Sequence, residues 1–167
     1  MQPDILNPDD PHARLRDEPG KKGGSPPAAT SAGAEIQLVT FFLNGEEYGV
    51  DAMRVREITG MAEITGIANS PRHVQGVMNL RGSMVPVISL RRRFGMPDPV
   101  DGGLGCIAVM DFRDQLTGFV IDEISDVLRV KRCDIQPPLA MFAKPWIEGV
   151  FITERKPVVF LNLEHLT

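Results

Sequence analysis

An internal repeat is the feature that most constrains the fold of this 167-residue chain. Residues 73–90 align without a gap on residues 146–163, and the matched positions keep their apolar or glycine character. The matched pairs are Val74/Ile147, Gly76/Gly149, Val77/Val150, Val85/Val158, Ile88/Leu161 and Leu90/Leu163. A second alignment, shifted by 69 residues, pairs Leu38/Ile107, Gly49/Gly118, Val55/Ile124 and Ile58/Val127. Two units of about 65 to 70 residues therefore repeat one structural plan.

The repeated pattern is typical of β-strands broken by turns. Residues 37–43 are rich in β-branched and aromatic side chains. Asn44-Gly45 directly follows them and is a strong hairpin signal, because both central residues of a type I′ turn need positive φ. Further strands are expected at 48–51, 74–80, 84–90, 106–112, 118–121, 147–153 and 158–163. Only 89–94 and 163–167 look helical, so the chain is predicted to be all-β.

Two related β units favour two small barrels that pack against each other. A unit of this size is marginally stable alone, and packing against its twin buries additional apolar surface. Two rounded barrels side by side leave a groove, and an apolar groove is a natural docking site for an amphipathic helix. We therefore expect a helix-binding groove between the barrels.

The first 35 residues differ in composition from the rest of the chain. They contain six of the 14 prolines and four glycines, with no Phe, Trp or Tyr. A segment without periodic apolar residues cannot offset its own ordering entropy. We predict a disordered tail at residues 1–35 and a folded domain at residues 36–167.

Charge and cysteine content argue against several classes of protein. The formal net charge is -4, so the chain lacks the positive field that draws proteins onto nucleic acid. Cys106 and Cys133 show no metal-ligand spacing, and neither a long apolar run nor a secretory leader is visible. We expect a cytoplasmic protein that binds no nucleic acid, no metal and no cofactor, and that reaches a membrane only through a partner.

Sequence motifs for catalysis are weak or misplaced. The segment 103–108 matches a loose dinucleotide-binding pattern, but it precedes a predicted strand instead of following one. His12, His73 and His165 have no partner at metal or nucleophile spacing. We therefore predict no catalytic residues and no enzymatic activity.

Two groups of charged residues have competing interpretations. Glu57 lies in an apolar β-forming run, and Arg81 lies in a tight, glycine-ended connection between two apolar strands. The second unit has Asp126 and Glu154 at these positions. Glu57 and Arg81 are either an edge charge and a surface turn, or an ion pair at the rim of the groove. Residues 91–93, three consecutive arginines, suggest phosphate contact or, as we prefer, the solvated last turn of a short helix, favoured by its dipole.

Several consecutive motifs resemble those of the CheW-type chemotaxis coupling proteins. They occur in the order and spacing of that family and cover about residues 36–166. These motifs are Gly45-Glu-Glu-Tyr-Gly-Val-Asp51, Val55-x-Glu-Ile58, Ile67-Ala-Asn-Ser-Pro71, Gly76-Val-x-Asn-Leu-Arg-Gly82, Val85-Pro-Val-Ile-Ser-Leu90 and Gly118-Phe-Val-Ile-Asp-Glu-Ile-Ser-Asp-Val127. Two features depart from the family pattern: Ser89 stands where the family often has Asp, and the C-terminal helix is short.

The resemblance implies a fold and a set of partners. The fold would be two intertwined, SH3-like, five-stranded β-barrels with short helices, and the protein would not be an enzyme. It would act as an adaptor that couples the cytoplasmic helical tip of a methyl-accepting chemoreceptor to a CheA-type histidine autokinase. Such a protein is expected in the cytoplasm, recruited to membrane receptor arrays. The regulatory domain of the kinase would be a related domain that packs barrel end against barrel end.

The resemblance also implies two sets of binding residues. The receptor helix is expected to bind Val55, Glu57, Arg81 and Met84. In that site Arg81 would pair with Glu57 and present its remaining N–H groups to the helix. The kinase regulatory domain is expected to bind Ile64, Thr65, Ile67 and Ser70 on one barrel and Ile135, Gln136 and Met141 on the other.

Two other classes of protein fit the sequence less well. One is the regulatory domain of a kinase or a receiver-fused coupling protein, and 167 residues with a 35-residue tail leave no room for the additional domain. The other is a barrel-type nucleic-acid binder, which needs aromatic stacking platforms and a basic groove. One Trp, one Tyr and a net charge of -4 argue against it.

Overall fold

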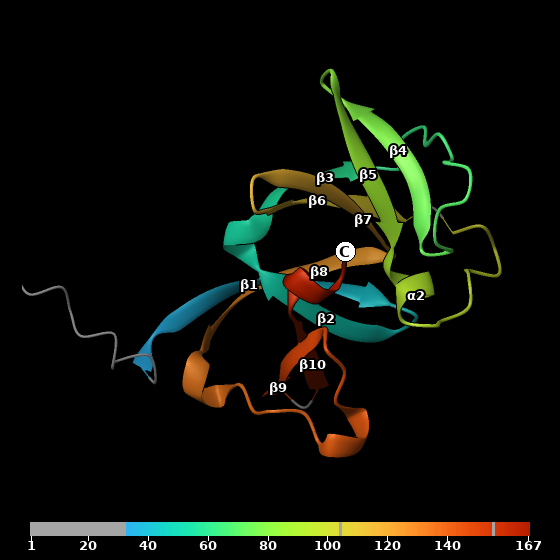
Figure 1. Cartoon of the computed structure of the whole chain (residues 1–167). Helices are drawn as coiled ribbons and strands as arrows, with labels where there is room; N and C mark the ends of the chain where they lie inside the picture. The colour runs from blue at the N-terminus through green and yellow to red at the C-terminus, as the bar shows by residue number, and fades with distance from the viewer. Residues whose placement is uncertain (1–32, 104, 155) are drawn as a thin grey trace, which may run out of the picture. The chain divides into compact units, whose positions relative to one another are not determined.

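The computed structural model describes residues 33–103, 105–154 and 156–167, and strands dominate this part of the chain (Figure 1). Most of the predicted tail, residues 1–32, lies outside the described residues. The strands are β1 (Glu35–Leu43), β2 (Glu46–Asp51), β3 (Val55–Gly60), β4 (Val74–Leu80), β5 (Ser83–Ser89), β6 (Cys106–Phe112), β7 (Gln115–Ile121), β8 (Glu123–Lys131), β9 (Ile147–Thr153) and β10 (Lys156–Leu161). The short helices are η2 (Ala52–Arg54), α2 (Leu90–Arg93), η3 (Arg132–Asp134), η4 (Ala140–Phe142) and η5 (Leu163–His165).

The strands form two five-stranded sheets with the same topology. One sheet has the order β8-β1-β2-β10-β9, and the other has the order β3-β6-β7-β5-β4. Each strand of one sheet corresponds to the strand of the other whose number differs by five: β8 to β3, β1 to β6, β2 to β7, β10 to β5 and β9 to β4. Hairpin β1–β2 of the first repeat unit pairs with β8 and β10 of the second, while hairpin β6–β7 pairs with β3 and β5 of the first. The two repeat units have therefore exchanged their first hairpins.

A short backbone bridge closes each sheet into an SH3-like barrel. After edge strand β3, Thr65 exchanges two hydrogen bonds of 2.9 Å with Val77 of the opposite edge strand, β4. After edge strand β8, Gln136 exchanges two hydrogen bonds of 2.8 Å with Val150 of β9. The chain that follows one edge strand thus returns to pair with the other edge. The predicted pair of five-stranded barrels is confirmed.

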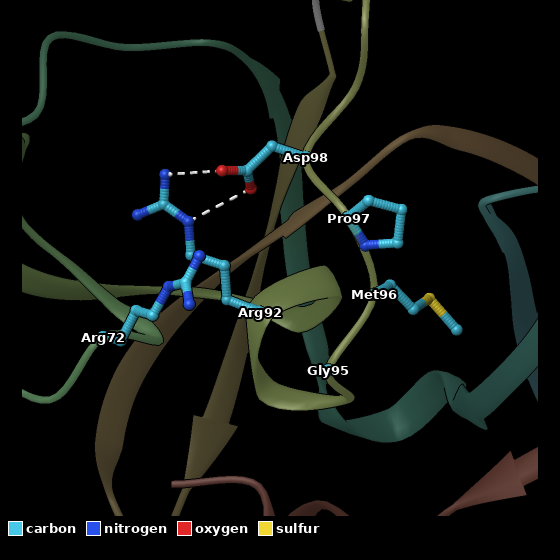
Figure 2. Close-up of a pocket in the computed structure, with 6 residues that line it drawn as sticks. All are labelled: Arg72, Arg92, Gly95, Met96, Pro97 and Asp98. Atoms are coloured by element: carbon cyan, nitrogen blue, oxygen red, sulfur yellow. Dashed lines mark hydrogen bonds and ion pairs between the residues drawn. The ribbon is translucent and has the colours of Figure 1, made fainter.

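Three consecutive arginines of α2 connect separate parts of the chain. Arg91 forms a bidentate ion pair with Asp122 at the β7–β8 junction. Arg92 pairs with Asp98 in the loop that follows the helix (Figure 2). Arg93 donates to two backbone carbonyls near the C-terminus and lies 4.9 Å from the centre of the tryptophan ring. The expectation of a solvated helix end is wrong, because each guanidinium has acceptors within its reach.

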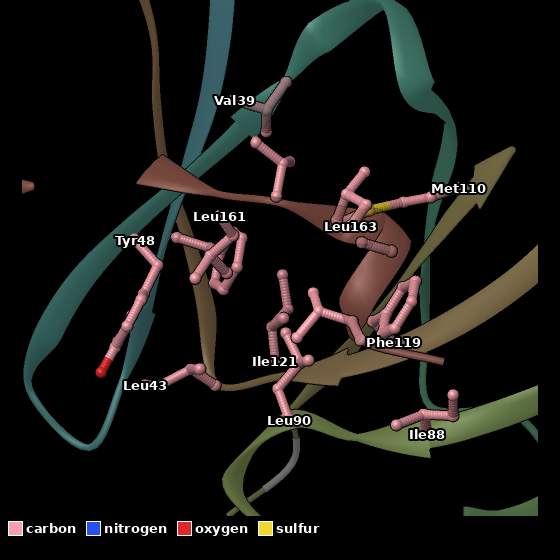
Figure 3. Packing of buried hydrophobic residues seen from close by; sticks show 14 residues of the cluster. Val39, Leu43, Tyr48, Ile88, Leu90, Met110, Phe119, Ile121, Leu161 and Leu163 are labelled. Carbon is pink, nitrogen blue, oxygen red and sulfur yellow. The ribbon is translucent and has the colours of Figure 1, made fainter. Parts of the chain in front are cut away.

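Three apolar clusters stabilise the two barrels. The interior of one barrel is formed by Met78, Val85, Val87, Ile107 and Val109, and that of the other by Leu38, Phe151, Val158 and Phe160. The third and largest cluster packs between the two sheets; among its buried members are Val39, Leu43, Leu90, Phe119 and Leu161 (Figure 3). This cluster fills the space between the two sheets. The expectation of a helix-binding groove at that place is therefore wrong.

Candidate partner-binding site

Strand β3 and the β4–β5 turn bring Glu57 and Arg81 together. Arg81 and Gly82 have positive φ values of 51° and 85°, as a tight hairpin turn requires. The side-chain oxygen of Asn79 accepts a 2.8 Å hydrogen bond from the Gly82 N–H and so holds this turn. Nη2 of Arg81 then lies 3.0 Å from Oε2 of Glu57. The two residues therefore form an ion pair between a surface turn and an edge strand, but the groove at whose rim the pair was expected is filled by the cluster between the sheets.

The exposure of this ion pair is better suited to recognition of a partner than to stabilisation of the fold. The side chain of Arg81 is 81% exposed and that of Glu57 is 27% exposed. An exposed ion pair contributes only about 0–1 kcal/mol to the free energy of unfolding. A guanidinium carries five N–H donors in a fixed fork, and one contact with a carboxylate uses only some of them. Arg81 therefore keeps donors for polar atoms of a partner.

The apolar residues near this pair differ in exposure. Met84 lies on β5, opposite Asn79 of β4. Its side chain is 64% exposed and offers an adaptable apolar surface. Val55 is half-buried and packs on the cluster between the sheets, so it adds little free surface. Sequence reasoning missed Met53, which precedes Val55 and is 84% exposed. Ile58 is exposed as well, but it alternates with Glu57 along β3 and so lies on the opposite face of the strand.

The two segments predicted to bind a kinase occupy equivalent places, next to the closing bridges of the two barrels. Thr65 and Gln136, which make the bridges, are exposed. A glycine opposite each bridge permits a close backbone approach. A Cβ at Gly76 would lie 2.0 Å from the carbonyl oxygen of Thr65, and a Cβ at Gly149 would lie 2.3 Å from Cγ2 of Ile135. The repeated glycines therefore leave the room that the two segments need, and the bridge hydrogen bonds hold the segments in place.

These segments combine anchored and exposed side chains. Ile64 and Ile135 are half-buried and pack against the two barrel interiors, which corrects the expectation that they lie in exposed turns. Ile67 and Met141 are 48% and 79% exposed. The hydroxyl of half-buried Ser70 donates a 2.9 Å hydrogen bond to the carbonyl of Ile67 and so fixes the turn that presents this isoleucine.

A groove of about 1490 Å³ borders the second of these segments. Its lining combines residues of segment 133–144 with strands β2, β9 and β10 and with Phe94 and Trp146, whose rings stack 5.6 Å apart. Leu139, within the predicted contact loop 135–141, and Phe142, just beyond it and missed by sequence reasoning, are exposed and extend the apolar lining. Both are large apolar residues on either side of Met141, in a stretch without strand alternation. This pattern is the sequence signal of an exposed apolar surface.

Burial shifts the pKa values of Tyr48 and Cys106. Burial raises the pKa of Tyr48, and the hydrogen bond from its hydroxyl to Glu46, 2.8 Å long, raises it further. Burial also raises the pKa of the Cys106 thiol and so keeps it protonated. The described residues contain no group of three or more His, Cys, Asp or Glu side chains that could hold a metal ion.

None of the helices in the described part of the chain is long and apolar enough to cross a membrane.

Together, the fold and its exposed surfaces define a β protein of two SH3-like barrels related by an internal repeat. The family model for the CheW-like domain matches residues 37–167, and the chain belongs to this family. The resemblance noted from the sequence motifs is confirmed.

Individual relatives agree with this assignment. The chemotaxis protein CheW of Klebsiella aerogenes is 32% identical over 133 residues, which cover 78% of this chain and 80% of the relative. The chemotaxis protein CheW of Treponema pallidum is 32% identical and covers 79% of this chain and 82% of its own length. The crystal structure of the scaffolding protein TtCheW from Thermoanaerobacter tengcongensis superimposes with a TM-score of 0.72 at 29% identity, over 80% of this chain and 88% of that one. The family context is therefore chemotaxis and scaffolding.

Proposed function

We propose that this chain is a non-catalytic adaptor that couples the cytoplasmic helical tip of a methyl-accepting chemoreceptor to the regulatory domain of a CheA-type histidine kinase. Its membership of the CheW family, which includes a scaffolding protein, supports this role. The observation that carries the proposal is the separation of two exposed surfaces on one hairpin. Arg81 lies in the β4–β5 turn, whereas Ser70 precedes the start of β4. The seven residues of β4, about 20 Å of strand, separate Ser70 from Arg81, whereas Thr65 pairs with Val77 and so lies beside β4 four residues before Arg81.

The receptor surface is centred on the pair of Glu57 and Arg81, with Met84 as its apolar part. A receptor helix would place polar atoms against the donors of Arg81 and apolar side chains against the methionine. The repeat places Asp126 and Glu154 at the positions of Glu57 and Arg81 in the other barrel. Two carboxylates cannot form such a pair, so each chain carries one receptor surface.

The kinase surfaces are the two segments beside the closing bridges. Ile67 on one barrel and Met141 on the other are exposed apolar side chains of the kind that anchor protein interfaces. Because the two segments are equivalent, one chain can contact two neighbouring barrel domains. Such an adaptor works in the cytoplasm and reaches receptor arrays at the membrane through its partners.

A binding experiment with both partners tests this function. The full chain is titrated with a soluble receptor-tip fragment, with the kinase regulatory domain, and with a mixture of both, and the complexes are sized by analytical ultracentrifugation. The adaptor function predicts saturable binding of each partner and a ternary complex in the mixture. Binding of neither partner, or mutual exclusion of the two, would overturn the proposal.

A further inference from the structure

The loop after α2 forms a small cavity that brings two guanidinium groups together. Its volume is about 320 Å³, and its lining consists of Arg72, Arg92, Gly95, Met96, Pro97 and Asp98 (Figure 2). Arg72 lies just before β4, and Arg92 lies on α2. None of the residues assigned above to the receptor or the kinase lines this cavity, so it represents a separate feature of the fold.

The charges of this cavity are unevenly matched. Arg92 donates two hydrogen bonds to the two carboxylate oxygens of Asp98, at 3.1 and 3.2 Å. These bonds lower the pKa of Asp98, and the charges of Arg72 and Arg91 lower it further. The ion pairs among the described residues include no partner for Arg72. The cavity lining therefore carries two cations, Arg72 and Arg92, and one anion, Asp98.

We propose that this cavity binds a phosphate-type oxyanion between Arg72 and Arg92, and that Asp98 occupies the fork of Arg92 when the oxyanion is absent. A guanidinium fork matches two oxygens of a phosphoryl group, and two guanidiniums match its double negative charge. The carboxylate of Asp98 already makes the bidentate contact that such an oxyanion would make. The other lining residues, Gly95, Met96 and Pro97, add no competing charge.

The shared chemistry of the ligand is a phosphoryl oxyanion, either free or attached to a protein. The test is a ¹⁵N–¹H NMR titration of the full chain with sodium phosphate at pH 7.5 and constant ionic strength. Saturable shifts confined to the amides of Gly95, Met96 and Asp98 are expected, with much weaker shifts for acetate, which has one charge. A parallel titration with a phosphoserine peptide distinguishes the two sources: tighter binding of the peptide indicates a phosphorylated protein, and equal or weaker binding indicates the free anion.

Variants of opposite effect make the test specific. Asp98→Asn removes the competing carboxylate and should tighten phosphate binding up to about fivefold, the upper range for one exposed ion pair. Arg72→Ala should weaken phosphate binding by a similar factor or more. Asp111→Asn and Arg56→Ala make the same charge changes in another Arg–Asp pair, outside the cavity, and should leave phosphate binding unchanged.

Three outcomes would overturn the proposal. These are shifts that do not saturate, shifts spread over all basic residues, and equal responses of Asp98→Asn and Asp111→Asn. If Arg72→Ala disturbs the whole spectrum, the comparison of the two Asp→Asn variants decides the question alone.

Discussion

The guanidinium of Arg81 meets the carboxylate of Glu57 at 3.0 Å, and the two residues come from opposite edges of one five-stranded sheet. Glu57 lies on edge strand β3, and Arg81 directly follows edge strand β4. In the other barrel the matched turn residue, Glu154, also has a positive φ, 44° against 51° for Arg81. The positive φ of this turn residue is therefore repeated while its charge is reversed. Under the proposed function, this difference in charge restricts the receptor surface to one barrel.

The glycine at the first closing bridge is predicted to be essential for stability. Gly76→Ala should lower the free energy of unfolding by about 3 kcal/mol, because Gly76 has a φ of 148° and a Cβ would lie 2.0 Å from the Thr65 carbonyl oxygen. Urea unfolding measures this loss. Gly60→Ala is the matched control: a Cβ there would meet nothing within 4 Å, so its effect should stay within about 0.5 kcal/mol. Equal midpoints for the two variants would contradict the account of barrel closure.

The ion pair between Arg91 and Asp122 is predicted to make stability depend on pH. Burial by itself would raise the pKa of Asp122, but the hydrogen bonds from Arg91 and from the Asn44 N–H outweigh it and hold the pKa below its usual value. A carboxyl whose pKa is lower in the folded state stabilises the fold above its unfolded-state pKa of about 3.9. This contribution is lost as the pH falls through the folded-state pKa.

The variant Asp122→Asn tests this dependence. It should lower the free energy of unfolding at pH 7 by about 1–3 kcal/mol, because it removes a charged acceptor from a partly buried guanidinium. The difference between the variant and the unaltered protein should shrink below about pH 4. Urea unfolding of both proteins at pH 7 and pH 3 measures it. A difference that stays constant between these pH values would show that the Asp122 charge does not stabilise the fold.

The exposed isoleucine beside the first bridge is predicted to be a kinase anchor. Ile67→Asp should abolish binding of the kinase regulatory domain, because it would bury an unpaired carboxylate in the interface. The melting temperature should change little, since Ile67 is 48% exposed. Val100→Asp is the control, at a residue that is 99% exposed and lies outside both proposed surfaces. Unfolding of the Ile67 variant would show that this residue belongs to the core, and unimpaired binding would remove it from the interface.

The fold could be predicted because its signals are local or repeated. The hairpin at Asn44-Gly45 has the two positive φ values, 51° and 84°, that its sequence indicates. The predicted helices at 89–94 and 163–167 appear as α2 and η5. The repeat alone could not show which hairpin joins which sheet, because an alignment relates equivalent strands and says nothing of their partners. The pairing of β2 with β10 depends on tertiary packing.

The candidate site could be predicted only in part. Glu57 and Arg81 stood out because each places a charge where the flanking residues are apolar. The burial of Val55, Ile64 and Ile135 could not be predicted, because alternation shows which face a residue occupies and not whether another element covers that face. The partners of the three arginines in α2 were missed because their acceptors lie beyond the helix, those of Arg91 and Arg93 in distant segments of the chain.

The central prediction is that Arg81 recognises the receptor and does not hold the fold. Arg81→Ala should change the melting temperature little, because the exposed pair contributes about 0–1 kcal/mol. Its affinity for the receptor tip should fall by about 1–3 kcal/mol, or roughly 5- to 150-fold, through the loss of charge-assisted hydrogen bonds. Glu154→Ala is the matched control, since it makes the same kind of change at the equivalent turn of the other barrel and should leave receptor affinity unchanged.

The most direct measurement is a parallel titration of the Arg81→Ala protein with the soluble receptor tip and with the kinase regulatory domain. The account predicts that receptor affinity falls while kinase affinity matches that of the unaltered chain. Unchanged receptor affinity would contradict the assigned site, and loss of affinity for both partners would show that Arg81 supports the fold.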